Sequence, residues 1–166
     1  EGVDVEERLD ETIPLDLEFE DHRGETVRLG DYFDGERPVL LTLNYYACPM
    51  LCGLQLNAVG DVLGELTWRP GENYRVVTIS FDPDEDAELA AAKRRSYLES
   101  MGRGDDVDWN FLVGDQEAID AITDAVGYRY NYVPESGEYA HPAAITFLTP
   151  DGRISRYLYG LAYNKQ

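Results

Sequence analysis

The pattern of apolar and polar residues predicts strands and helices along most of the chain. Apolar and polar side chains alternate over residues 15–19 and again over residues 26–29, with a turn between them, which predicts a β-hairpin. Residues 38–44 are mostly apolar at both odd and even positions, as expected of a strand buried on both faces. This strand leads directly to the two cysteines of the chain, Cys48 and Cys52.

Helical periodicity follows the cysteines. Apolar residues recur at helical spacing over residues 54–66, and Pro70 ends this predicted helix. Acidic residues precede a second predicted helix over residues 87–101, where they favour the positive end of the helix dipole. We expect a third helix to begin after Asp115, which has the residue type of an N-cap, and to end at Gly127.

The remaining segments read as strands. Residues 74–81 and 109–113 are rich in β-forming residues, and tyrosines alternate over residues 128–132. Two further strands, over residues 143–148 and 154–159, form a closing hairpin. A strand, a cysteine pair and a following helix are the core of a thioredoxin-like fold. We therefore predict an α/β, thioredoxin-like fold with a central mixed β-sheet flanked by helices and an N-terminal β-hairpin.

The length of 166 residues fits one domain, and we expect residues 15–166 to form it after a flexible acidic lead-in over residues 1–14. The net charge of -19, with no basic stripe, argues against nucleic acid as a partner, because phosphates would be repelled. A solvated acidic surface, a basic docking partner and a saline habitat all fit this acidity.

No apolar run in the chain is long enough to cross a bilayer. The chain begins at Glu1 rather than Met, and we expect that a signal peptide or membrane anchor precedes it.

Cys48 and Cys52 carry the first candidate chemistry. A helix N-terminus favours the thiolate over the thiol, and a thiolate pair can form a disulfide or chelate a soft metal. Redox enzymes of this fold usually have two residues between their cysteines, whereas this chain has three, a spacing that a metal tolerates. A structural zinc site would need a fourth ligand that the sequence does not offer.

His141 is the second candidate residue. It stands before Pro142 and a predicted buried strand, where thioredoxin-like domains bring a loop against their cysteines. Two thiolates and one imidazole would suit Cu(I), and the imidazole also suits Cu(II). The alternative is a strand-end histidine that bonds to the backbone. The other histidine, His22, falls in the predicted hairpin turn.

These features together resemble the Sco/SenC family of copper-handling, thioredoxin-like proteins that support assembly of cytochrome c oxidase. The resemblance spans nearly the whole chain after Leu15 and is carried by four segments: Asp21-His22-Arg23-Gly24, Cys48-Pro49-Met50-Leu51-Cys52, Ser80-Phe81-Asp82-Pro83 to Asp86, and Ala140-His141 with the Pro150-Asp151-Gly152 turn.

The resemblance implies a function and a set of site residues. It assigns the copper ligands to Cys48, Cys52 and His141, and places an acidic motif around the site at Asp82 and Asp86. It also implies that the copper-centre subunit of cytochrome c oxidase, or a related copper or thiol client, is the partner. The implied location is the periplasm or the outer face of a bacterial cytoplasmic membrane, with tethering by an N-terminal helix or lipid. We expect a monomer.

Two positions depart from the common family pattern. Gly53 follows the second cysteine, where the family usually has Pro, and Pro142 follows the histidine, where better-known members have a hydroxyl residue. The Cys-Pro-Met-Leu-Cys motif resembles a bacterial branch of the family, whose members need not serve the same oxidase.

The leading hypothesis is a copper metallochaperone. The runner-up is a thiol-disulfide oxidoreductase that reduces client cysteines before metallation, with Cys48 as the attacking thiol because it precedes the helix. A peroxidase is disfavoured because no Thr stands at the required place before Cys48. The least specific alternative is a redox-sensing or partner-docking module without catalysis.

Overall fold

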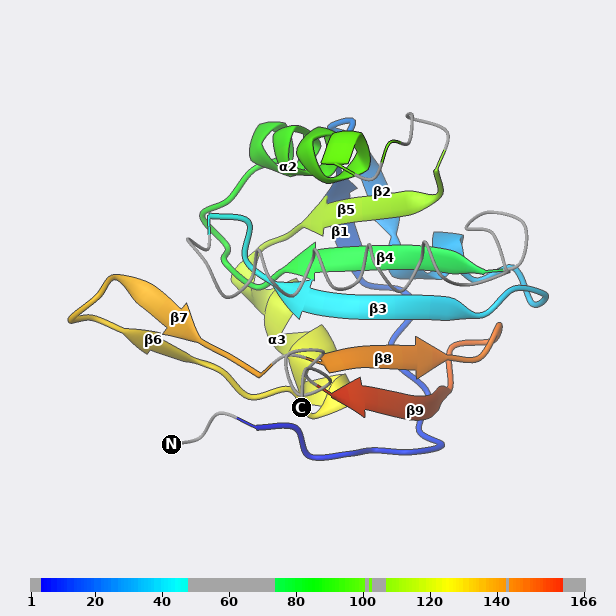
Figure 1. Cartoon of the computed structure of the whole chain (residues 1–166). Coiled ribbons are helices and arrows are strands. Elements are labelled where there is room, and N and C mark those ends of the chain that lie inside the picture. Colours follow the sequence, from blue (N-terminus) through cyan, green and yellow to red (C-terminus); the bar gives the residue numbers. More distant parts are fainter. Residues whose placement is uncertain (1–3, 48–73, 101, 103–106, 143, 160–166) are drawn as a thin grey trace.

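The computed structural model describes residues 4–47, 74–100, 102, 107–142 and 144–159. Within these residues, seven strands form one mixed sheet (Figure 1). They are β1 (Glu18–Asp21), β2 (Thr26–Arg28), β3 (Val39–Asn44), β4 (Arg75–Ser80), β5 (Trp109–Val113), β8 (Ala144–Leu148) and β9 (Ile154–Tyr159). The other described elements are the 3-10 helix η1 (Leu29–Tyr32), the helices α2 (Ala87–Ser100) and α3 (Gln116–Val126), and the strands β6 (Asn131–Val133) and β7 (Glu138–Ala140).

The strand order of the large sheet is β2-β1-β5-β4-β3-β8-β9. At its centre, β3 pairs in parallel with β4, and β4 pairs in parallel with β5. The flanking pairs, β1 with β5 and β3 with β8, are antiparallel. Because β3, β4 and β5 run in the same direction, the segments that follow Asn44, Ser80 and Val113 lie at one edge of the sheet.

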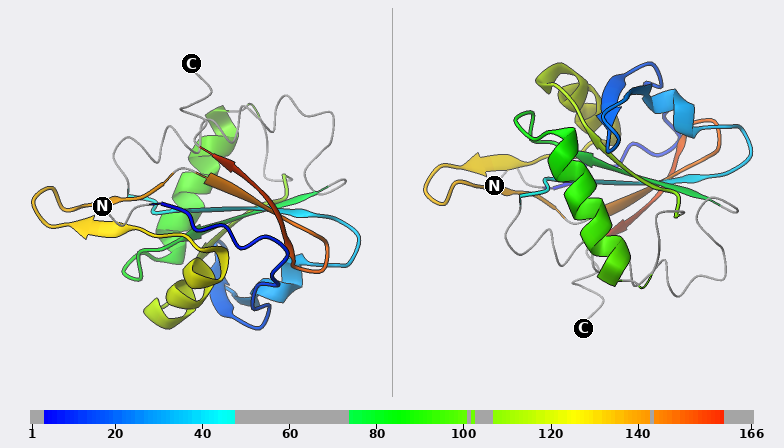
Figure 2. Two further views of the ribbon diagram at one scale, coloured as in Figure 1. Left: turned by 90° about the horizontal axis from the view of Figure 1, so that it is seen from below. Right: turned by 90° about the horizontal axis from the view of Figure 1, so that it is seen from above.

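Helices cover both faces of the sheet, as Figure 2 shows for α2 and α3 on opposite sides. Leu41 and Leu43 of β3 belong to the buried cluster that includes Ile119 and Ile122 of α3. Leu40, on the other face of β3, belongs to the cluster that includes Ala90 and Leu98 of α2. All six residues of β3 are buried for this reason. The predicted α/β fold with a mixed central sheet and an N-terminal hairpin is confirmed.

The third predicted helix has the caps that its sequence predicts. The Asp115 side chain accepts a hydrogen bond from the Ala118 amide at 2.9 Å, and this bond satisfies one of the free N–H groups at the start of α3. Gly127 ends the helix in the left-handed conformation with φ 72°. The helix therefore begins and ends where predicted.

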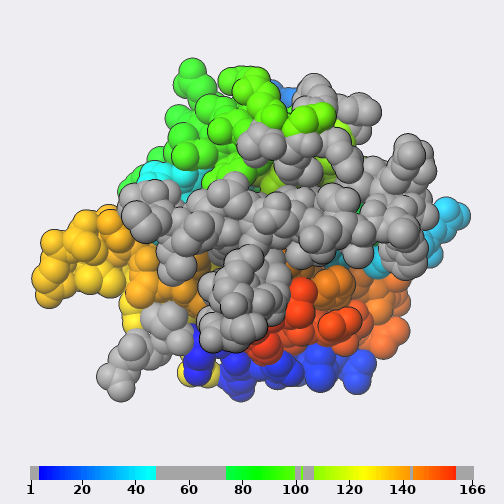
Figure 3. Space-filling view, in the orientation of Figure 1, coloured from blue at the N-terminus to red at the C-terminus, as the bar shows by residue number. Residues whose placement is uncertain are grey.

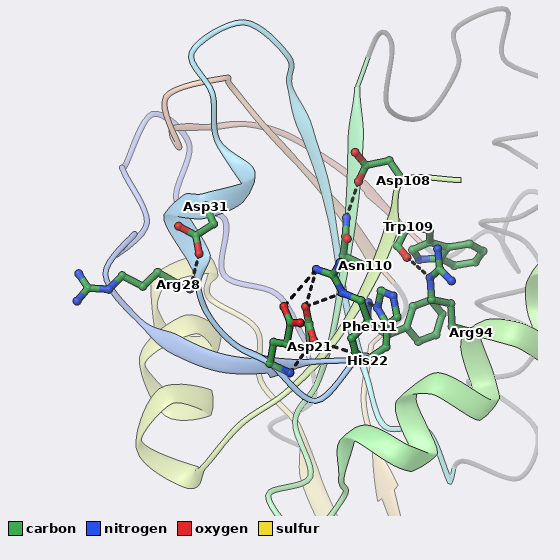
Figure 4. A network of polar contacts seen from close by, with 11 residues as sticks. Asp21, His22, Arg28, Asp31, Arg94, Asp108, Trp109, Asn110 and Phe111 are labelled. Atoms are coloured by element: carbon green, nitrogen blue, oxygen red, sulfur yellow. Dashed lines mark hydrogen bonds and ion pairs between the residues drawn. The ribbon is translucent and has the colours of Figure 1, made fainter. Parts of the chain in front are cut away.

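The hairpin of β1 and β2 is tied to β5 through its turn (Figure 4). The Phe111 amide donates to Nδ1 of His22 at 3.5 Å. Asp21 is buried, and its Oδ1 accepts hydrogen bonds from the Arg23 and Glu25 amides at 2.9 and 3.0 Å. His22 therefore links the β1–β2 turn to β5.

Several predicted segments differ from the structure or lie outside it. The first strand begins at Glu18 rather than at residue 15, and β7 was not predicted. Strands β6 and β7 form a separate two-stranded sheet that projects from the body (Figures 1 and 3). The predicted helix over residues 54–66, like Cys48 and Cys52, lies outside the described residues.

Part of the acidic lead-in contacts the rest of the domain. The Glu6 amide donates to the Gly127 carbonyl oxygen at 2.7 Å, and Ile13 is buried. These are contacts that the sequence did not predict for residues 1–14. Among the described helices, none is both long enough and apolar enough to cross a membrane.

Candidate functional site

His141 lies in the link between β7 and β8 and is only 5% exposed. Its Nδ1 is 2.9 Å from the Tyr128 hydroxyl oxygen and 3.0 Å from the Pro142 carbonyl oxygen. Because a carbonyl oxygen can only accept, we assign the proton of the neutral ring to Nδ1. The lone pair then lies on Nε2, the nitrogen through which this tautomer would bind a metal.

The surroundings of His141 favour the neutral imidazole. Burial lowers the pKa of His141, and the hydrogen bond to the Pro142 carbonyl oxygen opposes this shift without reversing it. A neutral imidazole is the form that binds metal ions. The site therefore presents this side chain in the state that a metal ligand needs.

Aromatic rings place His141 at the edge of the sheet where β3 and β4 end. Its ring centroid lies 6.0 Å from that of Tyr45, which follows β3, and 5.4 Å from that of Phe81, which follows β4. The Tyr45 ring also packs edge-on against Tyr139 at 4.9 Å. Tyr45 stands three residues before Cys48 in the sequence. His141 is thus packed against the segment that leads into the cysteine pair.

The two predicted thiol ligands, Cys48 and Cys52, are outside the described residues, so their distance from His141 is not part of the structure. In the part of the chain that the structure describes, no group of three or more His, Cys, Asp and Glu residues could hold a metal ion. A buried neutral imidazole and two thiolates would together fit copper, because thiolates select Cu(I) and imidazole suits Cu(II).

The two predicted acidic residues occupy different places. Asp82 is half-buried, and with Tyr45 and Tyr139 it lines a cavity of about 380 Å³. Its Oδ1 accepts a hydrogen bond from the Asp84 amide at 2.9 Å. Asp86 is exposed, and its Oδ1 accepts from the Leu89 amide at 2.9 Å, which is the bond of a helix N-cap. Asp82 therefore lies near Tyr45, the ring that packs against His141, whereas Asp86 caps α2.

Glu85 contacts the segment before the cysteines, and the sequence did not single it out. Its carboxylate accepts hydrogen bonds from the Tyr46 and Ala47 amides, both at 2.8 Å. It also accepts one from the Ser80 hydroxyl at 2.6 Å. Glu85 stands within a run of acidic residues, and only the fold distinguishes it from its neighbours.

Comparison with known proteins gives one family. The family model described as SCO1/SenC matches residues 5–166, nearly the whole chain. No curated protein sequence matches the chain at a significant level.

Solved structures with the same fold include three informative relatives. A protein of Aquifex aeolicus VF5, named for a suggested role in electron transfer, is 23% identical, with a TM-score of 0.79 over 95% of this chain and 91% of that one. ScoI of Bradyrhizobium japonicum, solved with copper bound, is 24% identical, with a TM-score of 0.66 over 91% and 89%. BsSco is 16% identical, with a TM-score of 0.67 over 93% and 87%; it is a member of the Sco family of cytochrome c oxidase assembly proteins in which a disulfide switch was identified. At these identities the likeness shows the thioredoxin-like fold.

Proposed function

Because the chain belongs to the SCO1/SenC family, we propose that it binds copper and supports assembly of the copper centre of cytochrome c oxidase. Cys48, Cys52 and His141 hold the ion as cargo in this proposal. The observation that carries it is the packing of buried His141 against Tyr45, three residues before Cys48. The copper bound to a relative, ScoI of Bradyrhizobium japonicum, supports it.

Each proposed ligand has a separate role. The two thiolates bind Cu(I) strongly because both partners are soft, while the imidazole adds the nitrogen ligand that Cu(II) prefers. Tyr128 and the Pro142 carbonyl oxygen engage Nδ1 and so orient Nε2 of His141. The carboxylate of Asp82, in the wall of the neighbouring cavity, adds negative charge near a cationic cargo.

The proposal also names a location and a partner. We place the protein in the periplasm or on the outer face of the cytoplasmic membrane, tethered by an N-terminal helix or lipid, and acting as a monomer. The partner is the copper-centre subunit of the oxidase or a related copper or thiol client. Transfer occurs by ligand exchange, in which client ligands replace Cys48, Cys52 and His141 one after another.

A thiol-disulfide oxidoreductase is the second candidate function. The disulfide switch identified in BsSco favours it, as does a cysteine pair that directly follows a central strand. In this alternative Cys48 attacks a client disulfide and forms a mixed disulfide. Cys52 then attacks Cys48, which releases the reduced client and leaves a Cys48–Cys52 disulfide.

An anaerobic titration of the fully reduced protein with Cu(I) and then Cu(II), against a chelator of known affinity, tests the proposal. We expect one tightly bound equivalent that requires Cys48. His141→Ala should weaken Cu(II) binding much more than Cu(I) binding, because the thiolates alone satisfy Cu(I).

His22→Ala is the matched control for His141→Ala. The chain has two histidines, and His22 lies in the β1–β2 turn, where the Phe111 amide of β5 donates to its Nδ1. This control should keep the affinity of the wild type for both ions. The oxidoreductase would be favoured by two results together. One is weak copper binding that does not change in His141→Ala, and the other is catalytic turnover of a disulfide substrate that Cys48→Ser abolishes.

A further inference from the structure

The carboxylate of Glu85 joins two segments at the edge of the sheet where β3 and β4 end. Its Oε1 accepts hydrogen bonds from the Tyr46 amide and from the Ser80 hydroxyl, at 2.8 and 2.6 Å. Its Oε2 accepts a hydrogen bond from the Ala47 amide at 2.8 Å. One side chain therefore satisfies two consecutive backbone N–H groups beyond the end of β3 and links them to the last residue of β4.

The neighbouring acidic residues do not make this link. Asp82 accepts from the Asp84 amide, and Asp86 accepts from the Leu89 amide, so both stabilise their own turn or helix start. Burial raises the pKa of Glu85, and the bonds from Ser80, Tyr46 and Ala47 oppose that shift only in part. Because burial disfavours the ionised form of Glu85, its place in the fold is better explained by these three hydrogen bonds than by exposure of a charge to water.

The segment that Glu85 holds leads directly into the cysteine pair. Tyr46 is fixed through its side chain as well: its hydroxyl oxygen lies 3.0 and 2.8 Å from the carbonyl oxygens of Thr78 and Leu112. Ala47, in contrast, is exposed and has only a methyl side chain, and among the described residues the bond of its amide to Glu85 anchors it. The next residue in the sequence is Cys48.

We propose that Glu85 is a positioning residue for Cys48. By fixing the backbone at Tyr46 and Ala47, its carboxylate determines where the chain enters the cysteine pair, and so pre-organises the thiolate of Cys48 for its reaction. The copper-related part of this inference rests on the proposed function, since it takes Cys48 to be a copper ligand. The positioning itself does not require copper.

Two substitutions of Glu85 test the effect on copper binding. Glu85→Gln keeps the size of the side chain but replaces one acceptor oxygen with an NH₂ group, which cannot accept from a backbone amide. Glu85→Ala removes both acceptors. We expect Cu(I) affinity to fall by about 10- to 100-fold, more for Ala than for Gln, as for other groups that orient metal ligands. Glu88→Gln, an exposed position in the first turn of α2, is the matched control and should bind like the wild type.

A second readout uses the reduced, copper-free protein. The rates at which iodoacetamide alkylates Cys48 and Cys52 are measured separately by mass spectrometry. Glu85→Gln should change the rate at Cys48 more than the rate at Cys52, and Glu88→Gln should change neither. Asp21→Asn controls for a general loss of stability, because Asp21, the last residue of β1, bonds to the amides of the β1–β2 turn; it should leave the ratio of the two rates unchanged.

The two readouts separate the inference from the proposed function. If the wild type binds no copper, the proposed function fails, but the alkylation rates still test Glu85. If Glu85→Ala does not fold, Glu85→Gln and Ser80→Ala, which removes one of the three donors, replace it. Folded Glu85 variants with the ratio of Cys48 and Cys52 alkylation rates of the wild type would overturn the inference.

Discussion

The Tyr128 hydroxyl is the group whose removal tests how His141 is held. Its oxygen lies 2.9 Å from Nδ1 of His141, and 2.9 and 2.7 Å from the carbonyl oxygens of Leu43 and Pro142. Tyr128 is buried, with 6% of its surface exposed. Tyr128→Phe deletes this one oxygen and leaves the ring in place against Phe81.

The expected loss of stability follows from the burial of this hydroxyl. Removing one partner of a buried hydrogen bond costs about 1–3 kcal/mol, because the remaining polar atoms lose a partner without gaining water. In a protein of this size each kcal/mol lowers the melting temperature by about 2–4 °C. Nδ1 of His141 also loses its contact with the Tyr128 hydroxyl and keeps the one with the Pro142 carbonyl oxygen, so we expect Cu(II) affinity to fall by about 10-fold or more, with a smaller loss for Cu(I).

Tyr157→Phe is the matched control for Tyr128→Phe. The Tyr157 hydroxyl donates to the Val126 carbonyl oxygen at 2.8 Å and accepts from the Arg8 amide at 3.1 Å. Tyr157→Phe should lower the free energy of unfolding in urea by a similar amount to Tyr128→Phe. It should leave copper binding unchanged in the chelator competition. If both variants weakened Cu(II) binding equally, or if Tyr128→Phe left it unchanged, the assignment of Tyr128 as the group that orients His141 would be wrong.

Two further predictions concern stability, both measured by urea unfolding. Burial opposes ionisation of Asp21, but bonds from the Glu25 amide and from Arg23 outweigh it and hold the pKa of Asp21 below its ordinary value of 3.8. A lowered carboxyl pKa adds stability above the pKa of the unfolded chain and loses it as the pH falls. Asp21→Asn should therefore be less stable than the wild type at neutral pH, with a difference that shrinks below about pH 4; a difference independent of pH would contradict this. Gly127→Ala should cost more than Gly35→Ala: both residues have positive φ, at 72° and 81°, but only at Gly127 would the new Cβ collide with the Glu6 carbonyl oxygen. Positive φ alone costs about 1–2 kcal/mol, and equal losses would refute the contact of the lead-in with Gly127.

Much of the fold could be predicted because local sequence and tertiary structure agree. The apolar run of β3 predicts burial on both faces, and helices on both faces bury it. Trp109–Val113 has the bounds predicted for β5, and Asp115 and Gly127 mark the ends of α3. In these segments the same residues determine the local conformation and the packing.

The unpredicted parts depend on partners outside their own residues, a neighbouring strand for β7 and distant residues for the lead-in. Strand β7, Glu138–Ala140, has no apolar alternation and is a strand because it pairs with β6. The lead-in carries few apolar residues, yet Ile13 is buried by contacts that form only in the folded domain. Neither segment has a periodic pattern that could reveal its role.

The candidate site likewise has residues that the sequence could predict and residues that it could not. The sequence indicated His141 by its place before a buried strand, and the structure packs it against Tyr45. Asp86 was grouped with the site by resemblance, yet its described contact is the cap of α2. Glu85 could not be distinguished from adjacent acids, because its bonds to Tyr46 and Ala47 connect positions 39 and 38 residues apart.

The central claim is that His141 and the cysteine pair bind the same copper ion. Pulsed EPR of the Cu(II)-loaded protein tests it most directly, because this method detects the nitrogen of an imidazole bound to the ion. We predict an imidazole signal in the wild type and in His22→Ala, and its loss in His141→Ala with Cu(II) still bound by the thiolates. An imidazole signal that persists in His141→Ala, or one that disappears in His22→Ala, would contradict the proposed copper site.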